Sequence, residues 1–117
     1  MAKTLVRQIL EGARELIETR ARWARHNLAL TRNNRECDPT EATAARFCAY
    51  GALIRSAYNL TGDVKQARDL AGKAAMSMTG RDNPHDAFEA IYSINDGPPA
   101  SSHKSIMLLF AKSLERV

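Results

Sequence analysis

Three side chains in the sequence could form a cysteine-dependent catalytic site. Cys48 would supply the nucleophile, His103 the base, and Asn95 or Asp96 the group that orients the histidine. The nucleophile is the thiolate, which needs a helix N-terminus or a cationic neighbour to form at neutral pH. The sequence around Cys48 predicts a position about ten residues inside an alanine-rich helix, beyond the reach of the first-turn dipole. A small buried side chain is therefore the favoured interpretation, and a cysteine enzyme is the last of three hypotheses.

No metal or organic cofactor is predicted. The residues that could ligate a metal are Cys37, Cys48, His26, His85 and His103. No two of them have the spacing of a Cys-x-x-Cys or His-x-x-x-His motif, so scattered histidines are the simpler interpretation. The sequence also lacks a glycine-rich loop of the kind that binds phosphates.

Asn95 and Asp96 form a polar pair between two predicted helices. Both residue types cap backbone groups and tolerate turn conformations. The favoured interpretation is that the pair ends one helix and fixes the loop to the next. Direct contact with a ligand is the alternative.

The clearest functional signal is a cluster of arginines around the only tryptophan. The chain has a net charge of +4, and residues 20–35 contain five arginines and no acidic residue. The candidate binding residues are Arg20, Arg22, Trp23, Arg25, Arg32 and Arg35. Arginine and an aromatic ring together suit phosphate and base contacts. Alternatively, the tryptophan fills the core while the arginines are solvated or pair with acids such as Glu36 and Asp38.

These residues depend on a central helix predicted at about 39–60. Asp38 and Glu41 match a capping box, Pro39 suits the first helical position, and Gly62 can end the helix. Its middle is apolar nearly all round, which is typical of a buried helix. One side carries small residues, and Gly51 among them predicts a close approach by another helix.

Four more helices are predicted around it. Apolar residues recur at helical spacing at 5–17, 64–78, 87–94 and 106–114. The caps predicted for them include Thr4, Asp63, Asn83 with Pro84, and Ser101 or Ser102. Residues from about 23 to 37 are predicted to be irregular, with a turn at Asn33–Asn34 and no sheet.

Part of the chain resembles a family of small bacterial and phage proteins of unknown function. The resemblance rests on Trp23, on the run Ala45-Arg46-Phe47-Cys48-Ala49 with Gly51-Ala52-Leu53, and on Asn95-Asp96 followed by His103. It spans roughly residues 23–110, and Phe47 replaces the tryptophan that is common in that family. The resemblance implies a fold but no activity.

These observations predict one all-α domain over residues 1–117, a compact bundle of about five helices around the central helix. The first functional hypothesis is a non-enzymatic protein-interaction or phage accessory protein with an unknown protein partner. The second is a weak nucleic-acid binder that uses residues 20–35. No stretch approaches the roughly 20 apolar residues that span a bilayer, and two cysteines give no disulfide framework. A cytoplasmic location without membrane contact is expected, while the oligomeric state is left open.

Overall fold

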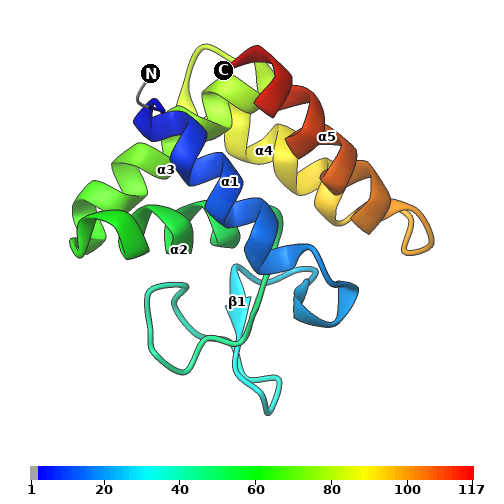
Figure 1. Ribbon diagram of the computed structural model, residues 1–117. Helices are drawn as coiled ribbons and strands as arrows, with labels where there is room; N and C mark the ends of the chain where they lie inside the picture. Colours follow the sequence, from blue (N-terminus) through cyan, green and yellow to red (C-terminus); the bar gives the residue numbers. More distant parts are fainter. Residues whose placement is uncertain (1–2) are drawn as a thin grey trace.

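The computed structural model describes residues 3–117 as a bundle of five helices (Figure 1). The helices are α1 (Leu5–Ile17), α2 (Ala49–Thr61), α3 (Val64–Thr79), α4 (Pro84–Asn95) and α5 (Ser102–Arg116). Between α1 and α2 lie a 3₁₀ turn, η1 (Arg20–Arg22), and two short strands, β1 (Ala29–Leu30) and β2 (Arg46–Phe47). The prediction of an all-α bundle of about five helices is confirmed.

The helix α2 is central and buried, as predicted. It contacts α1, α3 and α4, and most of its side chains are buried. On its small-residue side, Ser56 Oγ donates a hydrogen bond to the Ile9 carbonyl of α1 at 2.8 Å. At Gly51 the close neighbour is the Leu28 carbonyl, so the backbone that approaches there belongs to the coil and not to a helix as expected.

The prediction that this helix begins at residue 39 is wrong, because α2 begins at Ala49. Asp38 does not cap a helix; its Oδ1 accepts hydrogen bonds from the backbone and hydroxyl of Thr40 instead. The residues before α2 pair with the coil, since Ala45 N donates to Leu30 O at 2.9 Å and Cys48 N to Leu28 O at 3.2 Å. This pairing holds them extended and overrides their local preference for helix.

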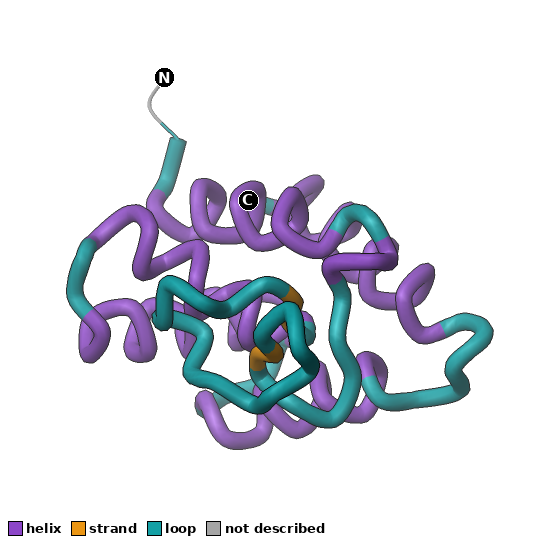
Figure 2. The backbone as a smooth tube through the Cα atoms, turned by 90° about the horizontal axis from the view of Figure 1, so that it is seen from below, coloured by secondary structure: helices purple, strands orange, loops and turns teal. Residues whose placement is uncertain are grey.

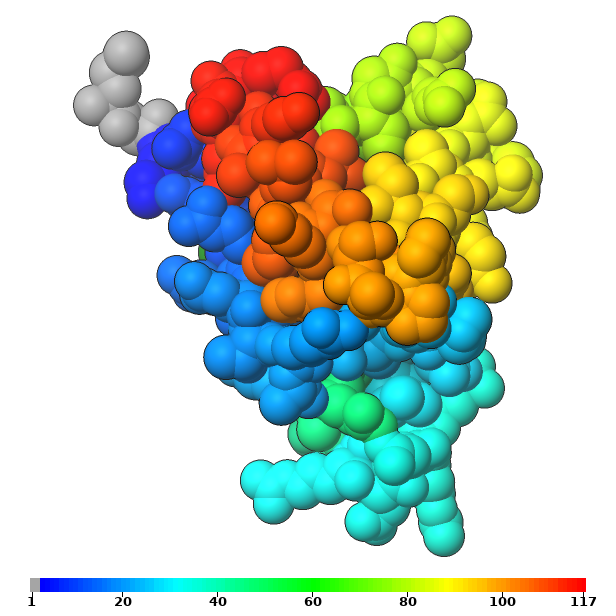
Figure 3. Space-filling view, turned by 90° about the vertical axis from the view of Figure 1, so that its right-hand side faces the viewer, coloured from blue at the N-terminus to red at the C-terminus, as the bar shows by residue number. Residues whose placement is uncertain are grey.

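The irregular segment extends beyond the predicted 23–37 and reaches Cys48. It contains the antiparallel pair β1–β2, with Ala29 opposite Phe47 and Leu30 opposite Arg46, where the sequence predicted no sheet. The coil crosses one end of the helices (Figure 2). In the space-filling view, residues around 30–40 project from that end of the molecule (Figure 3).

The predicted turns and caps position these elements. Asp63 and Asn83 accept hydrogen bonds from the first turns of α3 and α4, and Gly62 ends α2 in a left-handed conformation. Asn34 has φ of 63°, and its backbone N–H donates to Thr31 O at 3.0 Å, which confirms the predicted turn. No helix among residues 3–117 combines the length and apolar character needed to cross a bilayer.

Candidate functional site

The Asn95 amide, at the C-terminal end of α4, joins three parts of the fold. Its Oδ1 accepts hydrogen bonds from Trp23 Nε1 at 2.7 Å and from the first backbone N–H of α2, on Ala49, at 3.0 Å. Its Nδ2 donates to the Ala24 carbonyl at 3.0 Å and to Asp96 Oδ1 at 2.9 Å. The side chain is almost completely buried, so these contacts match the interpretation that Asn95 fixes a loop.

Asp96, the residue after Asn95, also binds the coil. Its Oδ1 accepts a hydrogen bond from the His26 backbone N–H at 2.9 Å. Arg25 Nη2 donates to the Asp96 carbonyl at 2.9 Å and also to the Gly97 carbonyl. The loop after α4 is therefore fastened to the coil after η1.

Trp23 does not offer a surface for base stacking. It is only 7% exposed, its indole nitrogen is bonded to Asn95, and its ring centroid lies 5.3 Å from that of His103. The burial follows from the position of Trp23 directly after η1, where it pairs with Phe47 and enters the core. Trp23 thus fills the core, as the alternative interpretation expects, and its binding role stays a prediction without support from exposure.

Cys48 is the N-cap of α2. The prediction that it lies about ten residues inside a helix is wrong. The Cys48 sulfur accepts a hydrogen bond from the Gly51 N–H at 3.3 Å. Part of the residue is exposed, but the thiol itself is surrounded by protein. This burial is the largest of several causes that together raise the pKa of the thiol to about 11. His103 Nε2 lies 2.8 Å from the Ile17 carbonyl, and the His103 ring packs against Trp23.

Within the described part of the chain, no hydrogen bond joins His103 to Cys48 or to the Asn95–Asp96 pair. The histidine that shares a pocket with Cys48 is His26, which the sequence suggested only as one of several scattered metal-ligand candidates. Among residues 3–117, no three His, Cys, Asp or Glu side chains gather in a way that could hold a metal ion.

The five arginines of residues 20–35 divide into two groups with different surroundings. Arg20 Nη2 donates to the Pro99 carbonyl at 2.7 Å, and Arg25 donates to the loop carbonyls named above. These two side chains therefore fasten the coil to the loop between α4 and α5. Across the described chain, Arg22, Arg32 and Arg35 make no ion pair, and no side-chain hydrogen bond of theirs is found.

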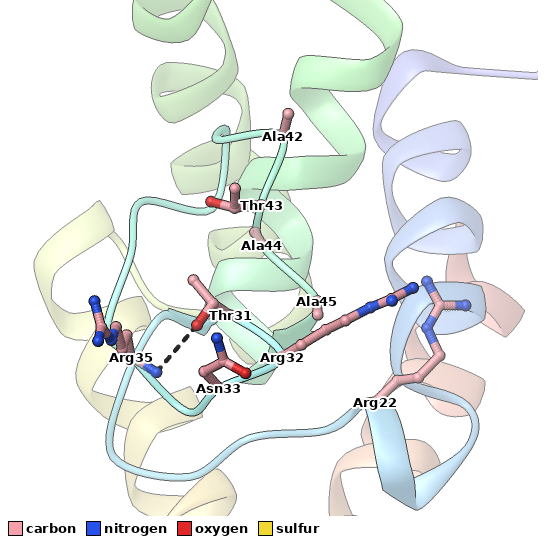
Figure 4. Close-up of a pocket in the computed structure, with 9 residues that line it drawn as sticks. All are labelled: Arg22, Thr31, Arg32, Asn33, Arg35, Ala42, Thr43, Ala44 and Ala45. Atoms are coloured by element: carbon pink, nitrogen blue, oxygen red, sulfur yellow. Dashed lines mark hydrogen bonds between the residues drawn. The ribbon is translucent and has the colours of Figure 1, made fainter.

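Arg22, Arg32 and Arg35 line one open groove with a volume of about 710 Å³. The remaining lining residues are Thr31, Asn33, Ala42, Thr43, Ala44 and Ala45, none of them acidic. Figure 4 shows the Arg32 side chain extending toward Arg22, while Arg35 lies on the opposite side. All three arginines are exposed, so solvent and large ligands reach them.

Local structure explains how residues far apart in the sequence reach this groove. The turn at Asn33–Asn34 places Arg32 and Arg35 on either side of a tight loop, which is closed by the Arg35 N–H donating to Thr31 Oγ1 at 3.2 Å. The β1–β2 pairing and the hydrogen bond from Ala45 N to Leu30 O bring the second wall beside it. The turn η1 then supplies Arg22.

The fold and groove describe a small helical protein with a basic surface formed by its coil. The model of the family of unknown function DUF6197 matches residues 1–114, and the chain belongs to this family. This confirms the resemblance to a family of unknown function. Comparison with curated proteins and with solved structures gave no match.

Proposed function

We propose that the protein binds nucleic acid electrostatically through the groove lined by Arg22, Arg32 and Arg35. The observation that carries the proposal is a set of three exposed guanidinium groups around one groove without a carboxylate in its lining. Guanidinium is always charged, and its fork of N–H donors matches phosphate oxygens. Like charges gathered without counter-charges also attract a polyanion from solution.

The composition of the groove supports phosphate contacts and not the reading of bases. Its lining residues come from the coil and η1, so no α-helix of the described chain lines the groove in the way that a recognition helix would. Trp23 is buried, so single strands gain no stacking from it. The expected binding is therefore weak, independent of sequence and strongly dependent on salt.

A salt titration tests the proposal, using the full chain with a labelled random duplex and with one of its strands. Three arginine–phosphate contacts predict a log–log slope of about −2.7 on the duplex and about −2.1 on the single strand. Replacing Arg22, Arg32 and Arg35 together by Ala should remove nearly all of this binding. The matched control replaces the exposed Lys73, Lys104 and Lys112 of α3 and α5 by Ala, which lowers the net charge equally.

Two results would contradict the proposal. One is the absence of binding to either probe at about 50 mM salt, where electrostatic contacts are strong. The other is equal weakening by the arginine and lysine triple variants, because that would assign the affinity to net charge and not to the groove.

A protein-interaction role, the first hypothesis from the sequence, stays a prediction. A flat exposed apolar patch would favour it. The large exposed apolar side chains of the described residues come one from each helix: Leu5, Leu60, Val64, Tyr92 and Leu108. Single exposed apolar residues are ordinary on a protein surface. A bacterial or phage origin and a cytoplasmic location also stay predictions.

A further inference from the structure

The three arginines of the groove form a pair and a single side chain. Arg32 points toward Arg22 within the groove, whereas Arg35 lies on the opposite side (Figure 4). Arg22 and Arg32 are both exposed, and neither makes an ion pair with any residue from 3 to 117. Two guanidinium groups are thus directed to one part of the groove without a counter-charge.

Local structure holds the backbone at both members of the pair. Arg22 ends η1 and is followed at once by Trp23, which is buried in the core. Arg32 lies in the tight loop after β1, where the Thr31 N–H donates to the Arg35 carbonyl at 2.9 Å. An anion that binds between the two guanidinium groups therefore has to order their side chains but not their backbones.

The carboxylates nearest to the groove leave the pair without a partner. Glu15 lines a neighbouring hollow together with Arg22, and Glu41 accepts a hydrogen bond from the hydroxyl of Thr43 in the groove wall at 3.4 Å. Neither carboxylate forms an ion pair with a groove arginine in the described chain. An anion with more than one negative charge would neutralise both members of the pair at once.

We infer that Arg22 and Arg32 together bind the terminal phosphate of a nucleic-acid strand, while Arg35 contacts a phosphate further along it, an inference that rests on the proposed function. A terminal phosphate carries a charge of about −1.5 to −2 at pH 7 and three acceptor oxygens. An internal phosphodiester carries a single charge. Two guanidinium forks therefore gain more charge-assisted hydrogen bonds from a strand end than from the middle of a strand.

The test compares two thymidine strands of equal charge by fluorescence anisotropy with the full chain at about 50 mM salt and pH 7.5. One is a hexamer with a 5′-phosphate, and the other is an octamer with a 5′-hydroxyl; both are labelled at the 3′ end. Each strand carries about seven negative charges, so net charge does not separate them. The phosphorylated hexamer should bind at least about fivefold more tightly than the octamer.

Variants of the groove arginines show where the strand end binds. Arg22→Ala and Arg32→Ala should each abolish the preference for the phosphorylated hexamer, and Arg32→Lys should retain only part of it, because lysine keeps the charge but lacks the fork of donors. Arg35→Ala removes the same charge from the same groove. It should weaken both strands alike and leave the ratio of their affinities unchanged. These side chains are exposed, so the variants should fold.

Two results would overturn the inference and leave the proposed function intact. One is equal, salt-dependent binding of the hexamer and the octamer. The other is loss of the preference in Arg35→Ala as well as in Arg32→Ala, because the strand end would then have no defined place in the groove. Failure of both strands to bind would instead remove the proposed function together with the inference.

Competition with thymidine 5′-monophosphate distinguishes a strand end from a free nucleotide, since both carry the same phosphate group. Displacement of the labelled hexamer only at concentrations at least about tenfold above its own Kd would support the strand end, because further phosphates of the strand add to its affinity. Displacement at concentrations near that Kd would overturn the strand end and identify a free nucleotide as the ligand.

Discussion

At Cys48, several opposing influences act on one thiol. Burial raises the pKa of the thiol most, hydrogen bonds from the backbone N–H groups of Gly51 and Tyr50 lower it, and the charge of Asp96 raises it again. The resulting pKa of about 11 means that the thiol stays protonated at neutral pH. A helix N-terminus alone therefore does not activate this cysteine.

The first prediction is that Cys48 reacts slowly with thiol reagents in the folded protein. A Cys37→Ser variant, in which Cys48 is the only thiol, should label slowly at pH 7.5, with a rate that rises with pH until about 11 as the thiolate forms. A Cys48→Ser variant tests Cys37, whose pKa is raised by burial and, after that, by nearby carboxylates. It should label faster, and rapid native labelling of Cys48 would revive the catalytic hypothesis.

The sequence identified the arginine segment but could not separate the arginines that bind loop carbonyls from those that face solvent. Whether an arginine fastens a loop or faces solvent depends on which carbonyls the fold brings near, and Pro99 and Gly97 are more than seventy residues away. The contact of His26 with Asp96 was missed for the same reason. It comes from the fold and from no local pattern.

At the level of elements, the helices were predictable because each has its own apolar period and its own caps. Asp63, Asn83 and Gly62 act within a few residues of their positions in the chain. The segment 38–48 was not predictable, because its composition suits a helix while residues 38–44 form turns and residues 45–48 pair with residues 28–30. Tertiary hydrogen bonds of this kind leave no trace in local periodicity.

The second prediction concerns the contact between α2 and the coil at Gly51. Any Cβ there would overlap the Leu28 carbonyl oxygen. Gly51→Ala should therefore lower the free energy of unfolding by about 1–3 kcal/mol, the usual cost of overpacking. The matched control is Gly72→Ala in α3, where the new methyl group would meet only side-chain atoms: the Pro84 ring at 3.2 Å and the Tyr50 hydroxyl at 3.8 Å.

Urea denaturation of both glycine variants measures the difference. In a helix, alanine is more stable than glycine by about 1 kcal/mol. This gain offsets the cost of the tight contact with Pro84, so Gly72→Ala should leave the free energy of unfolding nearly unchanged. Equal unfolding midpoints for the two variants would mean that the coil moves away from α2 without cost, and the close approach at Gly51 would then have no structural importance.

On the scale of the whole molecule, the positive charge lies on the part of the chain with the least regular structure. Residues 20–35 carry five arginines, while the remainder has a net charge of −1. The five helices pack into a bundle that supports the coil, and the residues that line the basic groove belong to the coil and η1. Arg20 and Arg25 hold the coil to the loop between α4 and α5, while Arg22, Arg32 and Arg35 have no side-chain partner among residues 3–117.

The last prediction is that arginines of these two groups differ in their effect on stability. Arg25→Ala removes hydrogen bonds to the Asp96 and Gly97 carbonyls and should lower the free energy of unfolding by about 1–3 kcal/mol. Arg32→Ala removes an exposed side chain with no partner in the described structure and should change it by less than about 0.5 kcal/mol. Urea denaturation at constant salt compares the two, since each variant loses one charge from the same segment. If Arg32→Ala were as costly as Arg25→Ala, the groove arginines would be structural, and their availability for phosphate would lose its basis.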